Sequence, residues 1–320
     1  MRKIYHFKPY LKPVIWGGTE IERLKHLPCE EKNIGESWEI SSVAGHESEV
    51  DGDSAESGLR ISELIDRYKG ALVGNKVYAR HGNSFPLLIK FIDAHSDLSV
   101  QVHPDDELAL KRHSCGGKTE MWYIMRSAPG ARIVSGLSRE LTKEEYRKLS
   151  GGAGILDFLA VHESHPGDVF FLPAGRIHSI GAGNLLVEIQ QPSDITYRVY
   201  DYDRRDSSGR TRELHVEDAA DAIDYTVYPD YRLNYDSESE RSTLVASPYF
   251  RVERLKGNGV TELQPPRDSF LTLTCVEGEA SLDVDCEKYL LEAGQTVLIA
   301  ASVRKIMATG NFIIIAASID

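Results

Sequence analysis

The architecture of this chain follows most directly from one segment, Gly167-Asp168-Val169-Phe170-Phe171-Leu172-Pro173-Ala174-Gly175-Arg176-Ile177-His178. Its first glycine favours a tight turn, and the apolar run that follows predicts a short strand buried on both faces. Pro173 and Gly175 then predict a corner. Such a corner re-aims the chain, so that the ring of His178 can point into the interior of a barrel. The segment therefore predicts a β protein in which His178 can face the interior of a barrel.

The rest of the sequence repeats this pattern of short strands. Glycine and proline punctuate most of the 320 residues, and the segments between them are rich in Val, Ile, Phe, Tyr and Leu. This pattern is typical of an all-β sandwich or barrel, so we predict a mainly all-β fold. The expected strands are 85–93, 98–103, 121–125, 168–172, 185–190, 249–252, 270–275, 280–284, 296–299 and 312–315.

Helices are expected to be few. Residues 62–72 suggest a helix with Ser62 as its N-cap, and residues 142–149 carry a capping box formed by Thr142 and Glu145. Shorter helices are expected at 105–112 and 215–223. The polar, aperiodic stretch 230–241 predicts a linker. The chain would then consist of an N-terminal unit, 1–230, with a small helical part, and an all-β C-terminal unit, 242–320.

A weak internal echo links the two expected units. Gly294-Gln295-Thr296-Val297-Leu298-Ile299-Ala300 repeats the glycine turn and buried strand of the first segment. The proline and the histidine have no counterpart in the second copy. If two related barrels exist, the C-terminal one is degenerate and without a metal site.

Composition narrows the possible partners. The formal net charge of −12 disfavours nucleic acid and anionic membranes. No apolar run is long enough to span a membrane, and the polar N-terminus does not resemble a secretory signal. We therefore expect a cytoplasmic protein with no nucleic-acid or membrane partner. Its four scattered cysteines, Cys29, Cys115, Cys275 and Cys286, are expected to be reduced.

Several metal-ligating residue types lie close enough in sequence to share one site. Gln101 and His103 are two residues apart in an expected strand, so both can face the same side. Glu120 opens the next strand. With His178, these residues supply two imidazoles, a carboxylate and an amide oxygen, a set that suits catalytic zinc. Considered alone, His178 would more often be a hydrogen-bonded structural histidine, and Gln101 could simply form a hydrogen bond inside the barrel.

The corner at 167–178 resembles the second metal-binding motif of the cupin superfamily, although that motif often has asparagine where this chain has Ala182. A closer resemblance is to type I mannose-6-phosphate isomerases in their shorter bacterial form. It rests on several motifs in the right order across most of residues 5–225. These motifs are Lys12-Pro13-Val14-Ile15-Trp16-Gly17-Gly18, Gly35-Glu36-Ser37-Trp38-Glu39-Ile40-Ser41, Phe85-Pro86-Leu87-Leu88-Ile89-Lys90-Phe91, Leu98-Ser99-Val100-Gln101-Val102-His103-Pro104, Gly117-Lys118-Thr119-Glu120-Met121-Trp122, Glu188-Ile189-Gln190-Gln191-Pro192-Ser193-Asp194 and Thr196-Tyr197-Arg198-Val199-Tyr200-Asp201.

This resemblance implies two cupin-like jelly-roll barrels, with the active site in the N-terminal unit. The implied reaction interconverts mannose 6-phosphate and fructose 6-phosphate through an enediol, with one Zn²⁺ per chain and a small sugar phosphate as partner. A monomer or weak homodimer is expected. By resemblance, the metal ligands are Gln101, His103, Glu120 and His178. The implied catalytic residues are Arg198, Lys118 and Glu188, and the implied substrate-binding residues are Lys90, Ser99 and Arg204.

The sequence does not decide which residue transfers the proton. Lys118 and Glu188 are candidates, provided that their surroundings move their pKa values toward neutrality. Arg204 departs from the lysine found in some relatives, and arginine cannot easily carry a proton. An anionic substrate needs a locally basic pocket in an acidic protein. Lys90, Lys118, Arg198 and Arg204 would form that pocket.

Each functional interpretation has an alternative. Without the resemblance, Arg198 would be interpreted as a surface ion-pair arginine near Asp201, and Lys118 as an exposed turn lysine. His95, His113, His162 and His165 are expected to be solvated, and Trp16, Trp38 and Trp122 to belong to the core. The rival functions are an iron-containing cupin oxygenase and a non-catalytic sugar-phosphate-binding cupin.

Overall fold

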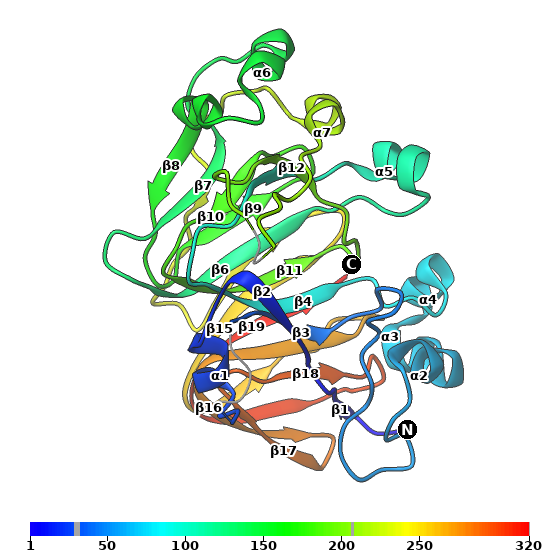
Figure 1. Cartoon of the computed structure of the whole chain (residues 1–320). Coiled ribbons are helices and arrows are strands. Elements are labelled where there is room, and N and C mark those ends of the chain that lie inside the picture. The colour runs from blue at the N-terminus through cyan, green and yellow to red at the C-terminus, as the bar shows by residue number, and fades with distance from the viewer. Residues whose placement is uncertain (29–32, 206–207, 320) are drawn as a thin grey trace.

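The computed structural model describes residues 1–28, 33–205 and 208–319. Strands make up 42% of the chain and helices 17%, so the predicted mainly all-β class is confirmed. Three antiparallel sheets are stacked on one another, with helices α6 and α7 beyond the sheet at the top of Figure 1. Among the described residues, no helix has the length and apolar character needed to cross a bilayer.

The middle sheet has seven strands in the order β13-β9-β6-β11-β4-β2-β3. Their bounds are Arg232–Leu233, Val169–Leu172, Glu120–Ser127, Asn184–Gln190, Leu88–Ala94, Tyr10–Gly18 and Ile34–Ile40. The five-stranded sheet that faces it runs β12-β5-β10-β7-β8. Those strands span Tyr197–Tyr200, Val100–Val102, His178–Ile180, Arg132–Leu137 and Leu159–Glu163.

The third sheet, which we call the C-terminal sheet, runs β1-β18-β16-β19-β15-β14, with β17 paired to β16. Its strands are Ile4–His6, Thr296–Ile299, Leu271–Val284, Ile306–Ser318, Arg251–Leu263, Arg241–Ala246 and Glu287–Glu292. The N-terminal strand β1 therefore belongs to a sheet that otherwise comes from the end of the chain.

All helices of the described chain precede residue 223. They are α1 Glu20–Leu24, α2 Ile61–Tyr68, α3 Gly70–Val73, α4 Asn75–His81, α5 Asp106–His113, α6 Lys143–Leu149, the 3₁₀ helix Ala153–Phe158 and α7 Val216–Ala222. The small helical part expected in the N-terminal unit is thus present. The capping box of Thr142 and Glu145 begins α6 as predicted, with donor–acceptor distances of 2.9 and 3.2 Å.

The middle sheet is buried on both faces, which explains its apolar strands. In β6, Trp122 and Ile124 point into the barrel formed with the five-stranded sheet, whereas Met121 and Tyr123 pack toward the C-terminal sheet. Side chains alternate between the two faces of a strand, so one strand serves two cores. Beyond the barrel, α6 and α7 cover the outer face of the five-stranded sheet through residues such as Tyr146 and Ala219.

Four local predictions need correction. Ser62 does not cap its helix, because α2 begins at Ile61, and the Ser62 hydroxyl donates to Glu47. The expected helix 62–72 is divided at Lys69, whose φ is 50°. The expected strands 270–275 and 280–284 form one strand, β16. The expected linker contains β13, which pairs with β9.

The cysteines agree with the expected reduced state as far as the structure describes them. Cys115, Cys275 and Cys286 are free thiols. Cys29 lies outside the described residues.

Candidate metal centre and active site

Facing rows of side chains build the site between the five-stranded sheet and the middle sheet. Within the five-stranded sheet, Gln101 on β5 lies opposite both His178 on β10 and Arg198 on β12. Residues directly opposite each other across antiparallel strands share a face. The ring of His178 lies edge-on to Trp122 of the middle sheet, with ring centroids 5.3 Å apart, so this shared face is the barrel interior.

The second row crosses the middle sheet. Glu188 on β11 lies opposite Trp122 on β6 and Lys90 on β4. The Lys90 ammonium donates to Glu188 Oε1 at 2.7 Å, and the Trp122 indole N–H donates to Oε2 at 2.8 Å. Both oxygens of Glu188 are therefore engaged inside the barrel.

Three potential metal ligands meet where the two rows approach each other. His103 follows β5, Glu120 begins β6 and His178 begins β10, and each is at most 1% exposed. His178 Nε2 lies 3.2 Å from Glu120 Oε1, and His103 Nε2 lies 3.5 Å from Glu120 Oε2. One ligand atom from each residue can be chosen so that all three lie within 4.8 Å of one another.

Both histidines are oriented by their other ring nitrogen. Nδ1 of His103 lies 2.8 Å from the Ile195 carbonyl oxygen, and Nδ1 of His178 lies 2.8 Å from that of Arg176. A carbonyl only accepts, so each Nδ1 carries the proton and each Nε2 turns a lone pair toward Glu120. Burial lowers the pKa of His178 to about 4 and that of His103 well below its usual value. Neutral imidazoles are the form that binds metal.

The donor atoms of this cluster fit a bound cation. Nε2 of His178 and both carboxylate oxygens of Glu120 are buried without a hydrogen-bond partner in the described chain, and of these oxygens Oε2 forms an ion pair with the Lys118 ammonium 3.3 Å away. Burial raises the pKa of Glu120 to about 7, and the nearby Glu188 carboxylate adds to that effect. Buried polar groups of this kind are costly unless they are paired or coordinate a metal. Two imidazoles and one carboxylate form a common catalytic zinc set, and Gln101 faces the same interior.

Lys118 lies beside this cluster and also lines the neighbouring cavity. Its ammonium is 3.1 Å from His103 Nε2 and 3.3 Å from Glu120 Oε2, and its side chain is 7% exposed. The alternative of an exposed turn lysine is therefore wrong.

A cavity of about 330 Å³ opens beside the cluster. Five cations and three carboxylates line it, so the cavity is locally basic within an acidic protein. The cations are Lys12, Lys90, Lys118, Arg198 and Arg212, and the carboxylates are Glu36, Glu188 and Asp194. Ser99 and Gln101 also contribute to the lining. Of the implied substrate-binding residues, Lys90 and Ser99 thus lie in the cavity wall.

Arg204 was expected in this site, but it does not line the cavity. Arg212 does line the cavity, and it was not predicted from the sequence. Arg204 donates to the Asp97 carbonyl oxygen at 2.6 Å and lies 3.2 Å from Asp201. Arg212 lines the cavity and holds Asp201 through two bonds of 2.8 and 2.6 Å. No motif marked Arg212, because its place in the cavity wall depends on its contact with Asp201.

Arg198 is not the surface ion-pair arginine of the alternative interpretation. Its Nη1 donates to the Glu213 carbonyl oxygen at 2.9 Å, and its Nε is buried without a partner in the described chain. Burial and the nearby charge of Arg212 lower the pKa of Arg198.

The surroundings of Glu188 do not move its pKa toward neutrality. Burial alone would raise that pKa, but the ammonium groups of Lys90 and Lys118 lower it to about 2. Glu188 is therefore a weak base in this structure. The expected solvation of His162 also needs correction, because His162 lies in β8 and packs near Phe170, with ring centroids 5.7 Å apart.

Comparison with known proteins places this site in a family. The model of the type I phosphomannose isomerase catalytic domain matches residues 4–124, and that of the mannose-6-phosphate isomerase cupin domain matches residues 240–319. A mannose-6-phosphate isomerase of Streptococcus mutans is 33% identical over 304 residues, which cover 94% of each chain. The chain belongs to the type I phosphomannose isomerase family.

Other members of the type I phosphomannose isomerase family support the same placement. Mannose-6-phosphate isomerase ManA of Bacillus subtilis is 36% identical over 282 residues, or 86% of each chain. The crystal structure of a mannose 6-phosphate isomerase from Bacillus subtilis matches 99% of both chains with a TM-score of 0.89 at 30% identity. The expectations of this family, of a cupin fold and of an isomerase are therefore confirmed.

Proposed function

We propose that the chain is a zinc-dependent aldose–ketose isomerase that interconverts mannose 6-phosphate and fructose 6-phosphate through an enediol. The observation that carries this proposal is the buried cluster of His103, Glu120 and His178 beside a basic cavity, in a chain of this family. The proposed metal ligands are these three residues and Gln101. When bound, zinc would polarise a sugar oxygen as a Lewis acid and orient the open-chain substrate.

Lys118 is the proposed proton carrier between C2 and C1. Its ammonium borders both the ligand cluster and the cavity. Arg198 is proposed to stabilise the negative charge that develops on the enediolate, because a preorganised cation is most effective where charge appears in the transition state.

Glu188 is proposed to position other groups. A carboxylate whose pKa lies near 2 accepts a proton poorly, and both of its oxygens already bind Lys90 and Trp122. It would thereby hold the Lys90 ammonium toward the substrate.

The phosphate group of the substrate is proposed to meet Arg212 and Lys12. Their side chains are 30% and 32% exposed, so they form the more accessible part of the basic lining. Arg204 does not line the cavity. It is proposed to support phosphate binding indirectly, because it contacts the same Asp201 carboxylate that holds Arg212. Guanidinium groups bind phosphate well through paired hydrogen bonds.

The C-terminal unit is proposed to be structural. No histidine occurs in residues 242–320, so this unit lacks the ligand type that the first site uses twice. The echo of the first segment is nevertheless visible in the backbone, since Gly167 and Gly294 have φ values of 90° and 91° and each precedes a four-residue strand.

The test is a coupled assay for fructose 6-phosphate formed from mannose 6-phosphate. Activity should disappear after chelation, return with Zn²⁺, and fall about 10²- to 10³-fold in kcat in Arg198→Ala, the loss typical of a transition-state charge contact. Arg241→Ala, which removes an arginine of β14 that is paired with Glu253 on β15, should retain wild-type activity.

The opposite results would reject parts of the proposal separately. Full turnover by a chain shown to be metal-free would remove the zinc assignment. Binding of the sugar phosphate without turnover in the zinc-loaded chain would favour a sugar-phosphate-binding protein. Oxygen consumption with bound iron would favour an oxygenase.

A further inference from the structure

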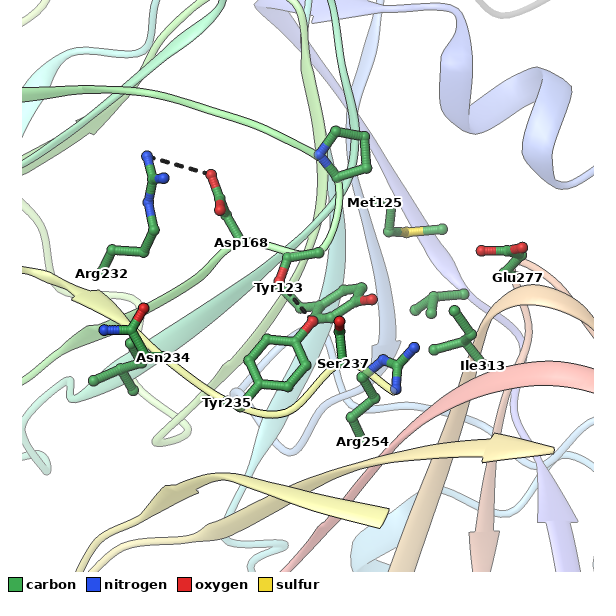
Figure 2. Close-up of a pocket in the computed structure, with 14 residues that line it drawn as sticks. Tyr123, Met125, Asp168, Arg232, Asn234, Tyr235, Ser237, Arg254, Glu277 and Ile313 are labelled. Carbon is green, nitrogen blue, oxygen red and sulfur yellow. Dashed lines mark hydrogen bonds and ion pairs between the residues drawn. The ribbon is translucent and has the colours of Figure 1, made fainter. Parts of the chain in front are cut away.

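A second cavity lies between the middle sheet and the C-terminal sheet. Its volume is about 440 Å³, and none of its lining residues contributes to the basic cavity described above. We call it the inter-sheet cavity. Tyr123 and Asp168 enter it from the middle sheet side, and Arg254, Glu277 and Ile313 from the C-terminal sheet (Figure 2).

Arg254 is a buried cation for which the described residues supply no counter-ion within ion-pair distance. Its residue is 4% exposed, and its Nε and Nη1 are buried with no hydrogen-bond partner in the described chain. The Tyr235 ring centroid lies 5.9 Å from the guanidinium carbon. Buried charges are normally paired, because removal from water strongly disfavours an isolated ion.

The other charged groups of the cavity do not supply that counter-ion. Asp168 accepts from the His165 backbone N–H at 2.8 Å and lies 3.4 Å from the Arg232 guanidinium. Glu277 lines the same cavity but forms no ion pair with Arg254. By contrast, Arg251 on the same strand β15 is paired with Glu253 at 3.3 Å.

Further donors and polar groups line the same cavity. Nε of Arg232 is also buried without a partner in the described chain. The Tyr235 hydroxyl donates to the Gly167 carbonyl oxygen at 2.8 Å, which fixes its ring beside Arg254. Asn234 and Ser237 complete the polar side of the wall (Figure 2).

We propose that the inter-sheet cavity binds a small oxyanion, a carboxylate or phosphate compound, through the Arg254 guanidinium. An arginine fork matches the paired oxygens of either group. This site is separate from the proposed catalytic cavity and does not depend on the reaction assigned to it. It also borders the catalytic barrel, because Tyr123 and the proposed ligand Glu120 project from opposite faces of β6.

The test measures anion-dependent thermal stability of the full chain. Sodium phosphate and sodium malonate are titrated separately at constant ionic strength with sodium chloride, against wild type, Arg254→Met and Arg251→Met. An anion that binds the native state raises Tm. Arg254→Met should weaken the apparent affinity about 10- to 100-fold, the effect of losing a charge-assisted hydrogen bond, while Arg251→Met should match wild type.

Binding of phosphate in the catalytic cavity would be common to all three proteins, so their difference isolates the inter-sheet cavity. If the part of the response that Arg254→Met loses is larger for phosphate than for malonate, the ligand class is a phosphate compound, and the reverse identifies a carboxylate. Equal responses in Arg254→Met and Arg251→Met would overturn the proposal.

A crystallographic measurement keeps the proposal testable if Arg254→Met does not fold. Wild-type crystals grown without phosphate or sulfate are soaked in sodium selenate, whose selenium gives an anomalous signal. A peak beside the Arg254 guanidinium is expected. An empty cavity with Arg254 turned onto Glu277 would overturn the proposal.

Discussion

Lys90 and Arg254 are both buried cations, yet their surroundings differ completely. The Lys90 ammonium lies 2.7 Å from Glu188 and 3.7 Å from Glu36, and it also lies over the Trp38 ring. Burial alone would lower the pKa of Lys90, but the Glu188 and Glu36 carboxylates raise it. The ion pair between Lys90 and Glu188 is therefore present throughout the neutral pH range. It stabilises the folded chain only while both partners are present.

Lys90→Met should destabilise the chain by about 3–5 kcal/mol, the usual cost of leaving one partner of a buried ion pair uncompensated. Urea unfolding measures this difference. Lys256→Met is the matched control, because Lys256 and Glu238 are 40% and 85% exposed, and it should change stability by no more than about 1 kcal/mol. A similar loss in both variants would contradict the proposed importance of burial.

The advantage of wild type over Lys90→Met should also depend on pH. The native pKa of Glu188 is about 2, below its ordinary value of 4.5, so the stabilisation by this carboxylate is present above pH 4.5. It is lost as the pH falls from there toward 2. The difference between the two proteins should therefore be steady near neutrality and shrink in acid. A difference that grows in acid would contradict the lowered pKa.

Sequence could predict which residues gather at the candidate metal centre, but not how they act. Gln101 and His103 share a face because of strand periodicity, and the corner before His178 marks its own position. The low pKa of Glu188 instead depends on Lys90, a partner on a neighbouring strand. Arg212 is held at the cavity by Asp201, and no local sequence pattern predicts this contact.

At the scale of elements, β16 shows where sequence prediction divided a single strand. Two strands were expected, 270–275 and 280–284, and Gly278 lies between them. The structure instead has an irregularity between Cys275 and Glu277, after which pairing with β19 resumes. Glycine inside a strand pattern is compatible with either a turn or a bulge, and the partner strand decides between them. Apolar periodicity predicted most strands better than it predicted their ends.

Gly278→Ala should destabilise the chain more than Gly45→Ala. Both positions have positive φ, 71° and 81°, so both variants carry backbone strain. A Cβ at residue 278 would lie 1.9 Å from the Asn311 carbonyl oxygen, whereas one at residue 45 meets no atom within 4 Å. We expect a further loss of about 1–3 kcal/mol for Gly278→Ala, as for overpacked sites. Thermal unfolding of the two variants checks this, and equal losses would contradict it.

At the scale of the whole molecule, the middle sheet joins the two sequence units into one body. Phe85 packs against Phe270 with ring centroids 4.6 Å apart, and Phe171 approaches Phe250 at 6.3 Å. One hydrophobic cluster includes residues from both units. The division near residue 230 is therefore much less distinct in the packed core than in the sequence.

A fragment of residues 1–230 should fail to form a stable native state. Without the C-terminal sheet, the apolar outer face of the middle sheet would be exposed to water, which disfavours folding and favours aggregation. The full chain should unfold in one calorimetric transition. A fragment that melts cooperatively by itself, with native near-ultraviolet circular dichroism, would contradict this prediction.

The pairing of β1 with β18 has a consequence for how the protein is made. Ile4 lies opposite Ile299, and His6 opposite Val297, so β1 pairs with a strand that is synthesised long after it. Until then β1 has no partner edge, and the face of the middle sheet that the C-terminal sheet covers is bare. Contacts between such distant segments form slowly, and unfinished chains with bare sheets are prone to associate. The C-terminal sheet can therefore form only after β18 and the strands around it have been synthesised, and chains that lack these strands should associate more readily than the full chain.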